Sequence, residues 1–207
     1  MTQRSDRSER EREREREREP GIEAVVIGGS AGAVTALGSI LSELPASFPA
    51  VLVVLHIPAT SPSLLVDVFA PHCRMRVCEP ESFERVERGS VYFAPPDYHL
   101  LVERDRRCSL SIEPPVRFSR PSVDVLFGSA AAAYGSRLVA VVLTGASDDG
   151  AEGLRAIHAA GGISIVQEPA SAEAPTMPKA ALAAVPSARV VRLSEIARQL
   201  LSLAQAS

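Results

Sequence analysis

The stretch that decides the fold is Ala24-Val25-Val26-Ile27-Gly28-Gly29-Ser30-Ala31-Gly32-Ala33. Its first four residues are apolar and largely β-branched, which predicts a buried strand, and the small residues after them allow a tight turn into a helix that begins near Ala31. The spacing Gly28-x-Ser30-x-Gly32 is typical of a nucleophile elbow, in which flanking glycines let the backbone bend and expose the serine hydroxyl. Free N–H groups at a helix N-terminus would equally bind a phosphate. Taken alone, the stretch leaves a nucleophile, a mononucleotide site and a plain strand-to-helix turn open.

Strand and helix patterns alternate along the rest of the chain. Continuous apolar runs at residues 50–55 and 138–143 are typical of parallel strands that are covered on both faces, and another strand is expected at 163–166. Helical spacing and capping signals predict helices at 31–44, from Ser61-Pro62 through 69, from about 122 to 134, and at 151–160. Short helices or strands at 179–184, 189–193 and 194–203 complete the chain.

The middle of the chain has a different pattern. Short β segments are expected at residues 75–78, 90–94, 99–102 and 109–112, and the last two form a hairpin across 104–107. The predicted fold class is therefore α/β: a three-layer, doubly wound, Rossmann-like arrangement with a mainly parallel sheet and an antiparallel β-hairpin at one edge.

The first 20 residues differ in composition from the remainder. They are dominated by Glu/Arg alternation and hold seven basic and seven acidic residues, so the net charge of −3 belongs to the rest of the chain. Residues 8–19 have no apolar side chain and cannot offset the entropy of ordering, so we expect a tail at 1–20 that is disordered or transiently helical, followed by one domain at 21–207. The acidic balance argues against a nucleic-acid partner.

Composition also bounds the cellular setting. No apolar stretch is long enough to insert in a membrane, and the start of the chain is unlike a secretory signal, so a cytoplasmic protein is expected. Cys73, Cys78 and Cys108 are odd in number and form no C-x-x-C pair, which favours reduced packing residues over disulfides or a zinc site.

The candidate chemistry follows from where the strands end. Parallel strands present their carboxyl ends at one edge of the sheet, where ligands bind. Ser30 follows the first strand, His56 follows the second, and Asp148 and Asp149 follow the 138–143 strand. Together they could supply a nucleophile, a base and an orienting carboxylate, in the chain order Ser, His, Asp. Either aspartate could instead cap the following helix.

These residues belong to a set of motifs that resembles a known family. From about residue 24 to 203 the chain resembles the catalytic domain of the chemotaxis protein-glutamate methylesterases, CheB. The matching motifs are Ile27-Gly28-Gly29-Ser30-Ala31-Gly32, His56-Ile57-Pro58, Gly89-Ser90-Val91-Tyr92-Phe93-Ala94-Pro95-Pro96-Asp97-Tyr98-His99, Arg120-Pro121-Ser122-Val123-Asp124-Val125-Leu126-Phe127, Leu143-Thr144-Gly145 with Asp149-Gly150-Ala151, Gln167-Glu168-Pro169-Ala170-Ser171, and Met177-Pro178.

The resemblance implies a serine carboxyl-ester hydrolase that demethylates glutamate methyl esters on chemoreceptor helices, and in some members deamidates receptor glutamines. It implies no cofactor and no metal, and a protein that is peripheral to receptor arrays. Ser30 would be the nucleophile, His56 the base, and Asp149 the carboxylate, because the family's aspartate lies immediately before Gly-Ala. Two sets of pocket residues are also implied: oxyanion N–H groups near Ala31 and Gly32 and in the Gly145–Ala146 turn, and Arg120 and the Met177-Pro178 loop in the cleft wall. Arg120 would equally suit a surface ion pair.

The chain departs from the family pattern in two places. It has Gly145-Ala146-Ser147-Asp148-Asp149-Gly150 where the family usually has Gly-Met-Gly-Asn-Asp-Gly, which changes the pocket wall and restricts the turn. Only the Glu/Arg tail precedes the catalytic part, so we expect a stand-alone domain without activation by phosphorylation in cis. A non-catalytic docking module of a chemosensory system is the alternative. Mononucleotide binding ranks last because a P-loop lysine is missing.

Overall fold

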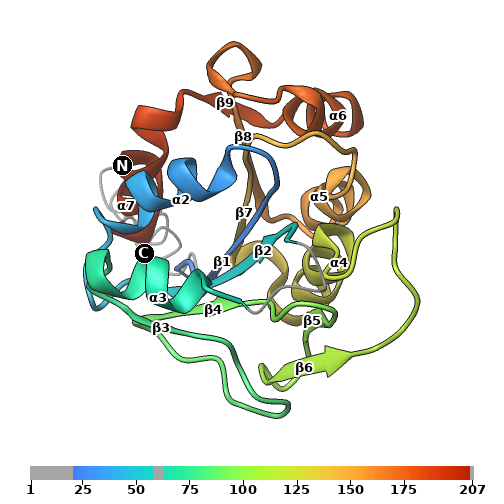
Figure 1. Ribbon diagram of the computed structural model, residues 1–207. Helices are drawn as coiled ribbons and strands as arrows, with labels where there is room; N and C mark the ends of the chain where they lie inside the picture. Colours follow the sequence, from blue (N-terminus) through green and yellow to red (C-terminus); the bar gives the residue numbers. More distant parts are fainter. Residues whose placement is uncertain (1–20, 58–62, 206–207) are drawn as a thin grey trace, which may run out of the picture.

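The fold is built on a seven-stranded parallel sheet. It is seen in a computed structural model, which describes residues 21–57 and 63–205 (Figure 1). In spatial order the strands are β3 (Arg76–Cys78), β4 (Ser90–Phe93), β2 (Ala50–Leu55), β1 (Ala24–Gly29), β7 (Leu138–Val142), β8 (Ile163–Gln167) and β9 (Arg189–Val191). Strand β1 lies in the middle, paired with β2 on one side and with β7 on the other.

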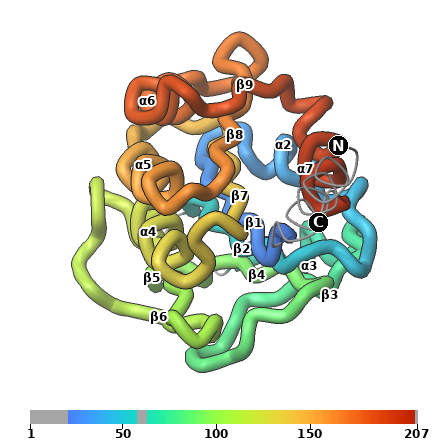
Figure 2. Tube along the Cα trace, turned by 180° about the vertical axis from the view of Figure 1, so that it is seen from behind, coloured from blue at the N-terminus to red at the C-terminus, as the bar shows by residue number. Residues whose placement is uncertain are grey.

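Helices cover both faces of this sheet, as Figures 1 and 2 show from opposite sides. One face is covered by α2 (Ala33–Leu41), α3 (Leu65–Phe69) and α7 (Leu193–Gln205). The other face is covered by α4 (Val123–Tyr134), α5 (Ala151–Ala159) and α6 (Thr176–Ala184). The predicted three-layer, doubly wound α/β fold is therefore confirmed.

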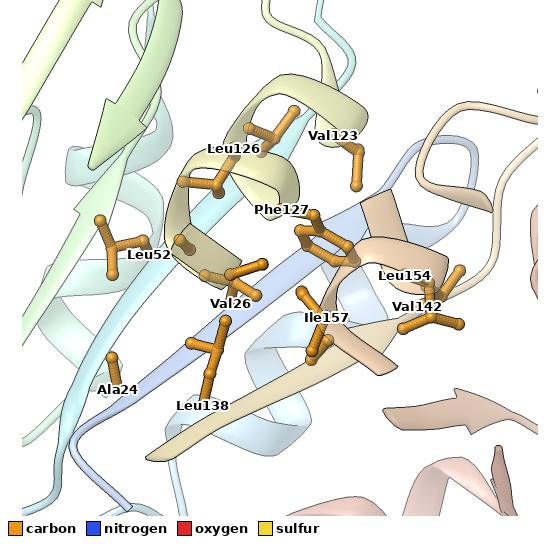
Figure 3. Packing of buried hydrophobic residues seen from close by; sticks show 14 of the residues in the cluster. Ala24, Val26, Leu52, Val123, Leu126, Phe127, Leu138, Val142, Leu154 and Ile157 are labelled. Atoms are coloured by element: carbon orange, nitrogen blue, oxygen red, sulfur yellow. The ribbon is translucent and has the colours of Figure 1, made fainter. Parts of the chain in front are cut away.

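The two faces of β1 explain why its sequence is apolar throughout. Val25 and Ile27 belong to the core on the α2 and α7 side, whereas Val26 belongs to the core under α4 and α5. Figure 3 shows Phe127 of α4 and Ile157 of α5 packed toward the latter side of the sheet. A strand that is buried on both faces does not alternate between apolar and polar residues. Its sequence therefore shows a continuous apolar run and not the two-residue period of a half-exposed strand.

The predicted hairpin is present, and its position differs from the expectation in one respect. Strands β5 (His99–Val102) and β6 (Cys108–Ser111) pair antiparallel, but they form a separate two-stranded sheet that packs against α4. The two β segments before them, β3 and β4, join the large sheet as parallel strands. Only the second half of the expected insert is therefore antiparallel.

Several element ends also differ from the sequence-based expectation. Helix α2 begins at Ala33 because Gly32, its N-cap, has φ of 78°, and it ends at Leu41. Helix α6 begins at Thr176, so Met177 and Pro178 lie in its first turn and not in a loop. The expected tail at 1–20 and the helix start at Ser61-Pro62 lie outside the described residues. Within the described residues, every helix is too short or too polar to cross a bilayer.

The strand order fixes where a site can form. The chain leaves β1 toward α2 on one face and leaves β7 toward α5 on the other, so the order reverses between these neighbouring strands. Connections that diverge to opposite faces open a crevice at the carboxyl edge of the sheet. The residues that follow β1, β2 and β7 surround this crevice.

Close packing at Gly28 ties α4 to the central strand. A Cβ at this position would lie 2.2 Å from Val123 Cγ1. We expect Gly28→Ala to lower the free energy of unfolding by about 2 kcal/mol because Val123, and α4 with it, must shift. The double variant with Val123→Ala removes the clashing methyl groups, so in denaturant unfolding its loss should be smaller than the sum of the single losses by about 1 kcal/mol. Strict additivity would contradict this account.

Candidate active site

The carboxyl edge of the sheet holds a buried histidine–aspartate pair. His56 Nε2 lies 2.8 Å from Asp149 Oδ2, and the two side chains are 14% and 0% exposed. His56 directly follows β2, and its N–H donates to the carbonyl of Gly29, the residue before Ser30. The structure thus joins His56 to Asp149 through side chains, and joins His56 to the Ser30 turn through the backbone.

Asp149 is held by three further hydrogen bonds. Oδ1 accepts the Ser122 hydroxyl proton at 2.8 Å and the Asp124 N–H at 2.9 Å, and Oδ2 accepts the Val123 N–H at 2.7 Å. Burial by itself would raise the pKa of Asp149, but the bonds from His56, from the two N–H groups and from Ser122 outweigh it, and the pKa lies below its ordinary value. Asp149 is therefore an ionised carboxylate, and it accepts a hydrogen bond from the N–H at His56 Nε2.

Asp149 and Asp124 cap each other's helices. Asp149 accepts two N–H groups at the start of α4, and Asp124, in the first turn of α4, accepts the N–H groups of Gly150 and Gly153 at the start of α5. Such bonds satisfy donors that a helix N-terminus leaves unpaired. The helix-cap role considered for the aspartate pair is therefore real, but Asp149 caps α4 and not the helix that follows it.

Ser122 and His99 extend this network behind the carboxylate. The Ser122 N–H donates to His99 Nδ1 at 3.2 Å, and His99 Nε2 lies 3.2 Å from the Pro114 carbonyl oxygen. Since Nδ1 accepts, Nε2 bears the proton and His99 is neutral. Ser122 is fully buried and His99 is 1% exposed, so both support Asp149 from inside. The sequence alone predicts no role for Ser122.

The turn at Ser30 is less strained than a nucleophile elbow. Among the described residues, five non-glycine positions have positive φ, and Ser30 is not one of them. The left-handed conformation falls on Gly32 instead, where a glycine adopts it without steric cost. The Ser30 N–H donates to the Thr144 carbonyl at 3.0 Å, which fixes the turn to the end of β7.

The backbone N–H groups around Ser30 differ in availability. Those of Ala31, Gly32 and Ala146 have no acceptor among the described residues. The Gly145 N–H, which we expected to help hold an oxyanion, donates to the Ala174 carbonyl at 2.9 Å. The expectation for Gly145 is therefore wrong on this point, because its donor is used within the protein, and Ala146 is the free donor of that turn.

Gly145 and Met177 pack against the turn that contains Ser30. A Cβ at Gly145 would lie 2.0 Å from Met177 Sδ and 3.0 Å from Ser30 Cβ, and Met177 is 1% exposed. Met177 therefore does not line an open cleft as expected. It supports the turn from below, and only a glycine at 145 allows this approach.

Arg120 has both of the roles that sequence analysis left open. Its guanidinium contacts Asp97, with Nη2 2.6 Å from Oδ1, and donates to the carbonyls of Ile112 and Glu113. It also lines a cleft of about 420 Å³. The cleft-lining residues are His56, Ile57, Asp97, Pro115, Phe118, Ser119, Arg120 and Pro121.

The competition between the two neighbouring aspartates has a clear structural outcome. Asp148 is exposed and pairs with Arg117, whereas Asp149 is buried against His56. The other histidines lie apart from this pair, since His72 and His158 are exposed and His99 is buried behind Ser122. In the part of the chain that the structure describes, no cluster of three or more His, Cys, Asp or Glu side chains is placed to hold a metal ion.

A doubly wound α/β sheet that presents a serine, a histidine and a buried carboxylate at one edge defines the class of serine hydrolases. Comparison with known proteins then gives the family. The family description "CheB methylesterase" matches residues 25–200, and the chain belongs to this family.

Individual relatives agree with this assignment. A Leptospira interrogans protein, provisionally named protein-glutamate methylesterase/protein-glutamine glutaminase, is 43% identical over 88% of this chain and 95% of its own length. The Rhizobium johnstonii protein-glutamate methylesterase/protein-glutamine glutaminase 2 is 39% identical over 86% of this chain. The match covers 49% of that longer protein. The crystal structure of the Thermotoga maritima CheB methylesterase catalytic domain matches with a TM-score of 0.83 and 31% identity, covering 89% of this chain and all of that one, 100%.

The contrast between the two aspartates yields a stability test. Asp149→Asn places an amide NH₂ among four donors, so we expect the free energy of unfolding at pH 7 to fall by about 3 kcal/mol. The matched control Asp148→Asn removes only a half-exposed ion pair and should cost less than about 1 kcal/mol. Urea unfolding of both variants measures the difference.

The same pair has an expected pH dependence. Folding lowers the pKa of Asp149, so its stabilising contribution is complete above its unfolded pKa of about 3.9 and is lost as the pH falls through the lower, folded value. The gap between wild type and Asp149→Asn should therefore be constant from pH 7 to about 5 and should shrink below about 4. A gap that already closes at pH 6 would show that Asp149 is not held ionised.

Proposed function

We propose that the protein is a protein-glutamate methylesterase and protein-glutamine glutaminase of a chemotaxis system, acting on methylated chemoreceptor helices. The observation that supports this most directly is the His56–Asp149 pair, which lies at the same sheet edge as Ser30 in a member of the CheB methylesterase family. We further propose that residues 21–207 act as the catalytic domain, without a cofactor, in the cytoplasm and at the periphery of receptor arrays.

In the proposed mechanism Ser30 is the nucleophile and His56 the base. Because His56 Nε2 donates to Asp149, the nitrogen left to accept a proton is Nδ1. Ser30 Oγ attacks the ester carbonyl carbon while its proton passes to Nδ1, and Asp149 stabilises the imidazolium that forms. The carbon–methoxy bond then breaks, Nδ1 returns the proton to the methoxy oxygen, and methanol leaves.

A second half-reaction regenerates the enzyme. Water gives one proton to Nδ1 and attacks the acyl carbon, the bond to Ser30 Oγ breaks, and Nδ1 returns that proton to the serine. Glutamic acid is released and loses its remaining proton to the solvent. Glutamine would follow the same course with ammonia as the leaving group. The negative charge that develops on the carbonyl oxygen requires preorganised donors, and the free N–H groups of Ala31 and Ala146 on either side of Ser30 suit this role.

Methanol release from methyl-labelled chemoreceptor membranes tests the proposal. We expect the wild-type chain to release methanol and Ser30→Ala to lose more than about 10³-fold in rate, because a nucleophile is removed. Ser39→Ala is the matched control, since Ser39 is an exposed serine of α2 whose hydroxyl only contacts the Ala36 carbonyl. Thermal unfolding checks that all three proteins are folded.

Two outcomes would count against this function. Undiminished release by Ser30→Ala would reject Ser30 as the nucleophile. A folded wild-type chain that binds the receptor membranes without releasing methanol or ammonia would instead support the docking-module alternative.

A further inference from the structure

The loop between β6 and α4 projects from the body of the molecule. Figures 1 and 2 show it as an outlying yellow-green segment on the side of the α4 layer. Phe118 lies on this loop and its side chain is fully exposed, with a relative exposure of 103%. An aromatic side chain left entirely in water makes no contribution to the folding of its own domain.

The conformation that presents Phe118 is itself unfavourable. Arg117 and Phe118 have φ of 47° and 62°, in the left-handed region that bulky residues rarely adopt. Two consecutive residues of this kind persist only where the surroundings impose them.

Contacts on both sides of Phe118 hold the loop in place. Val116 and Ser119 exchange two backbone hydrogen bonds across Arg117 and Phe118, of 3.1 and 2.9 Å. The Arg117 guanidinium pairs with Asp124 and Asp148, and Arg120 contacts Asp97 and two loop carbonyls. The loop is therefore a fixed support, and its two arginines are already neutralised by carboxylates.

Phe118 belongs to the cleft that reaches the catalytic histidine. Its apolar lining residues are Ile57, Pro115, Phe118 and Pro121, and His56 lines the same cleft. A glutamyl side chain is short, so an ester that reaches Ser30 and His56 brings the backbone of its own protein onto the rim of this cleft. If that backbone is a helix, the residues three or four positions from the ester lie about 5–6 Å away along the same face.

We propose that Phe118 is a docking residue for the protein substrate, and that it packs against an apolar side chain about one turn from the methyl-esterified glutamate on the receptor helix. This inference rests on the proposed function. Phe118 gives apolar contact area from a pre-ordered position, so binding does not have to order the loop. Its role is to discriminate a helical protein ester from a small free ester.

The test compares two substrates with two phenylalanine variants. The substrates are methyl-labelled receptor membranes and a small soluble ester, N-acetylglutamate γ-methyl ester. The variants are Phe118→Ala and the matched control Phe83→Ala, which removes another exposed phenylalanine, 70% exposed with φ of 69°, from the loop after β3. Phe83 lines a separate pocket with Arg76 and Glu84. Initial rates over a range of receptor concentrations give kcat and KM.

We expect Phe118→Ala to lower kcat/KM for the receptor about tenfold more than for the small ester, mainly through KM, as loss of an exposed aromatic anchor does. Phe118→Leu, which keeps an apolar side chain, should recover part of that loss. Phe83→Ala should lower both values equally or not at all.

Other outcomes would overturn the inference. Equal losses on both substrates would mean that Phe118 supports the site and does not dock the receptor, and an unchanged receptor rate would remove the role altogether. Failure of the proposed function is distinguishable, because the wild-type chain itself would then release no methanol from receptor membranes, before any variant is compared.

Discussion

The burial of one carboxylate governs the organisation of this site. An ionised aspartate away from water is unfavourable unless donors surround it, and Asp149 accepts two hydrogen bonds on each oxygen. Two of those donors are backbone N–H groups at the start of α4, so the position of this helix on the sheet is tied to the position of Asp149. Asp124 does the same for α5, and the two helices are thereby fixed to each other and to the sheet.

This arrangement combines structural and chemical requirements in a single side chain. The donors that stabilise Asp149 inside the protein also lower its pKa and keep it ionised. An ionised acceptor then fixes which nitrogen of His56 bears the proton. Ser122 completes the set from behind, and neutral His99 holds the Ser122 backbone. The orientation of His56 thus depends on Ser122 and His99, which do not contact it directly.

Sequence patterns predicted the parts of the molecule that depend on local composition. Apolar runs gave strands β1, β2 and β7 with nearly correct limits, and the rule that sites form at the carboxyl ends of parallel strands brought Ser30, His56 and Asp149 together. The resemblance distinguished Asp149 from Asp148, and the structure agrees in burying only the former.

The features that escaped prediction depend on contacts between distant segments. Nothing near Ser122 indicates that its hydroxyl faces a residue of the β7–α5 turn, and nothing near Gly145 indicates that Ala174 takes its N–H. Met177 was expected in a cleft wall because its motif suggested a loop. It lies instead in the first turn of α6, next to Pro178, and is buried against Gly145 below the Ser30 turn. The hairpin was predicted, but its packing on α4 required the helix to be in place.

The position of β1 between β2 and β7 also limits the order in which the strands of the sheet can pair during folding. Strand β1, which precedes Ser30, is synthesised before its neighbour β7 and before the turn that contains Asp149, because the hairpin and α4 lie between them in the chain. Such parallel pairing closes a long loop and has a high contact order, so it belongs to the slow steps of folding. Until β7 has been made, β1 lacks its neighbour on that side and His56 lacks the carboxylate of Asp149. The pairing of His56 with Asp149 is in this sense a property of the completed sheet.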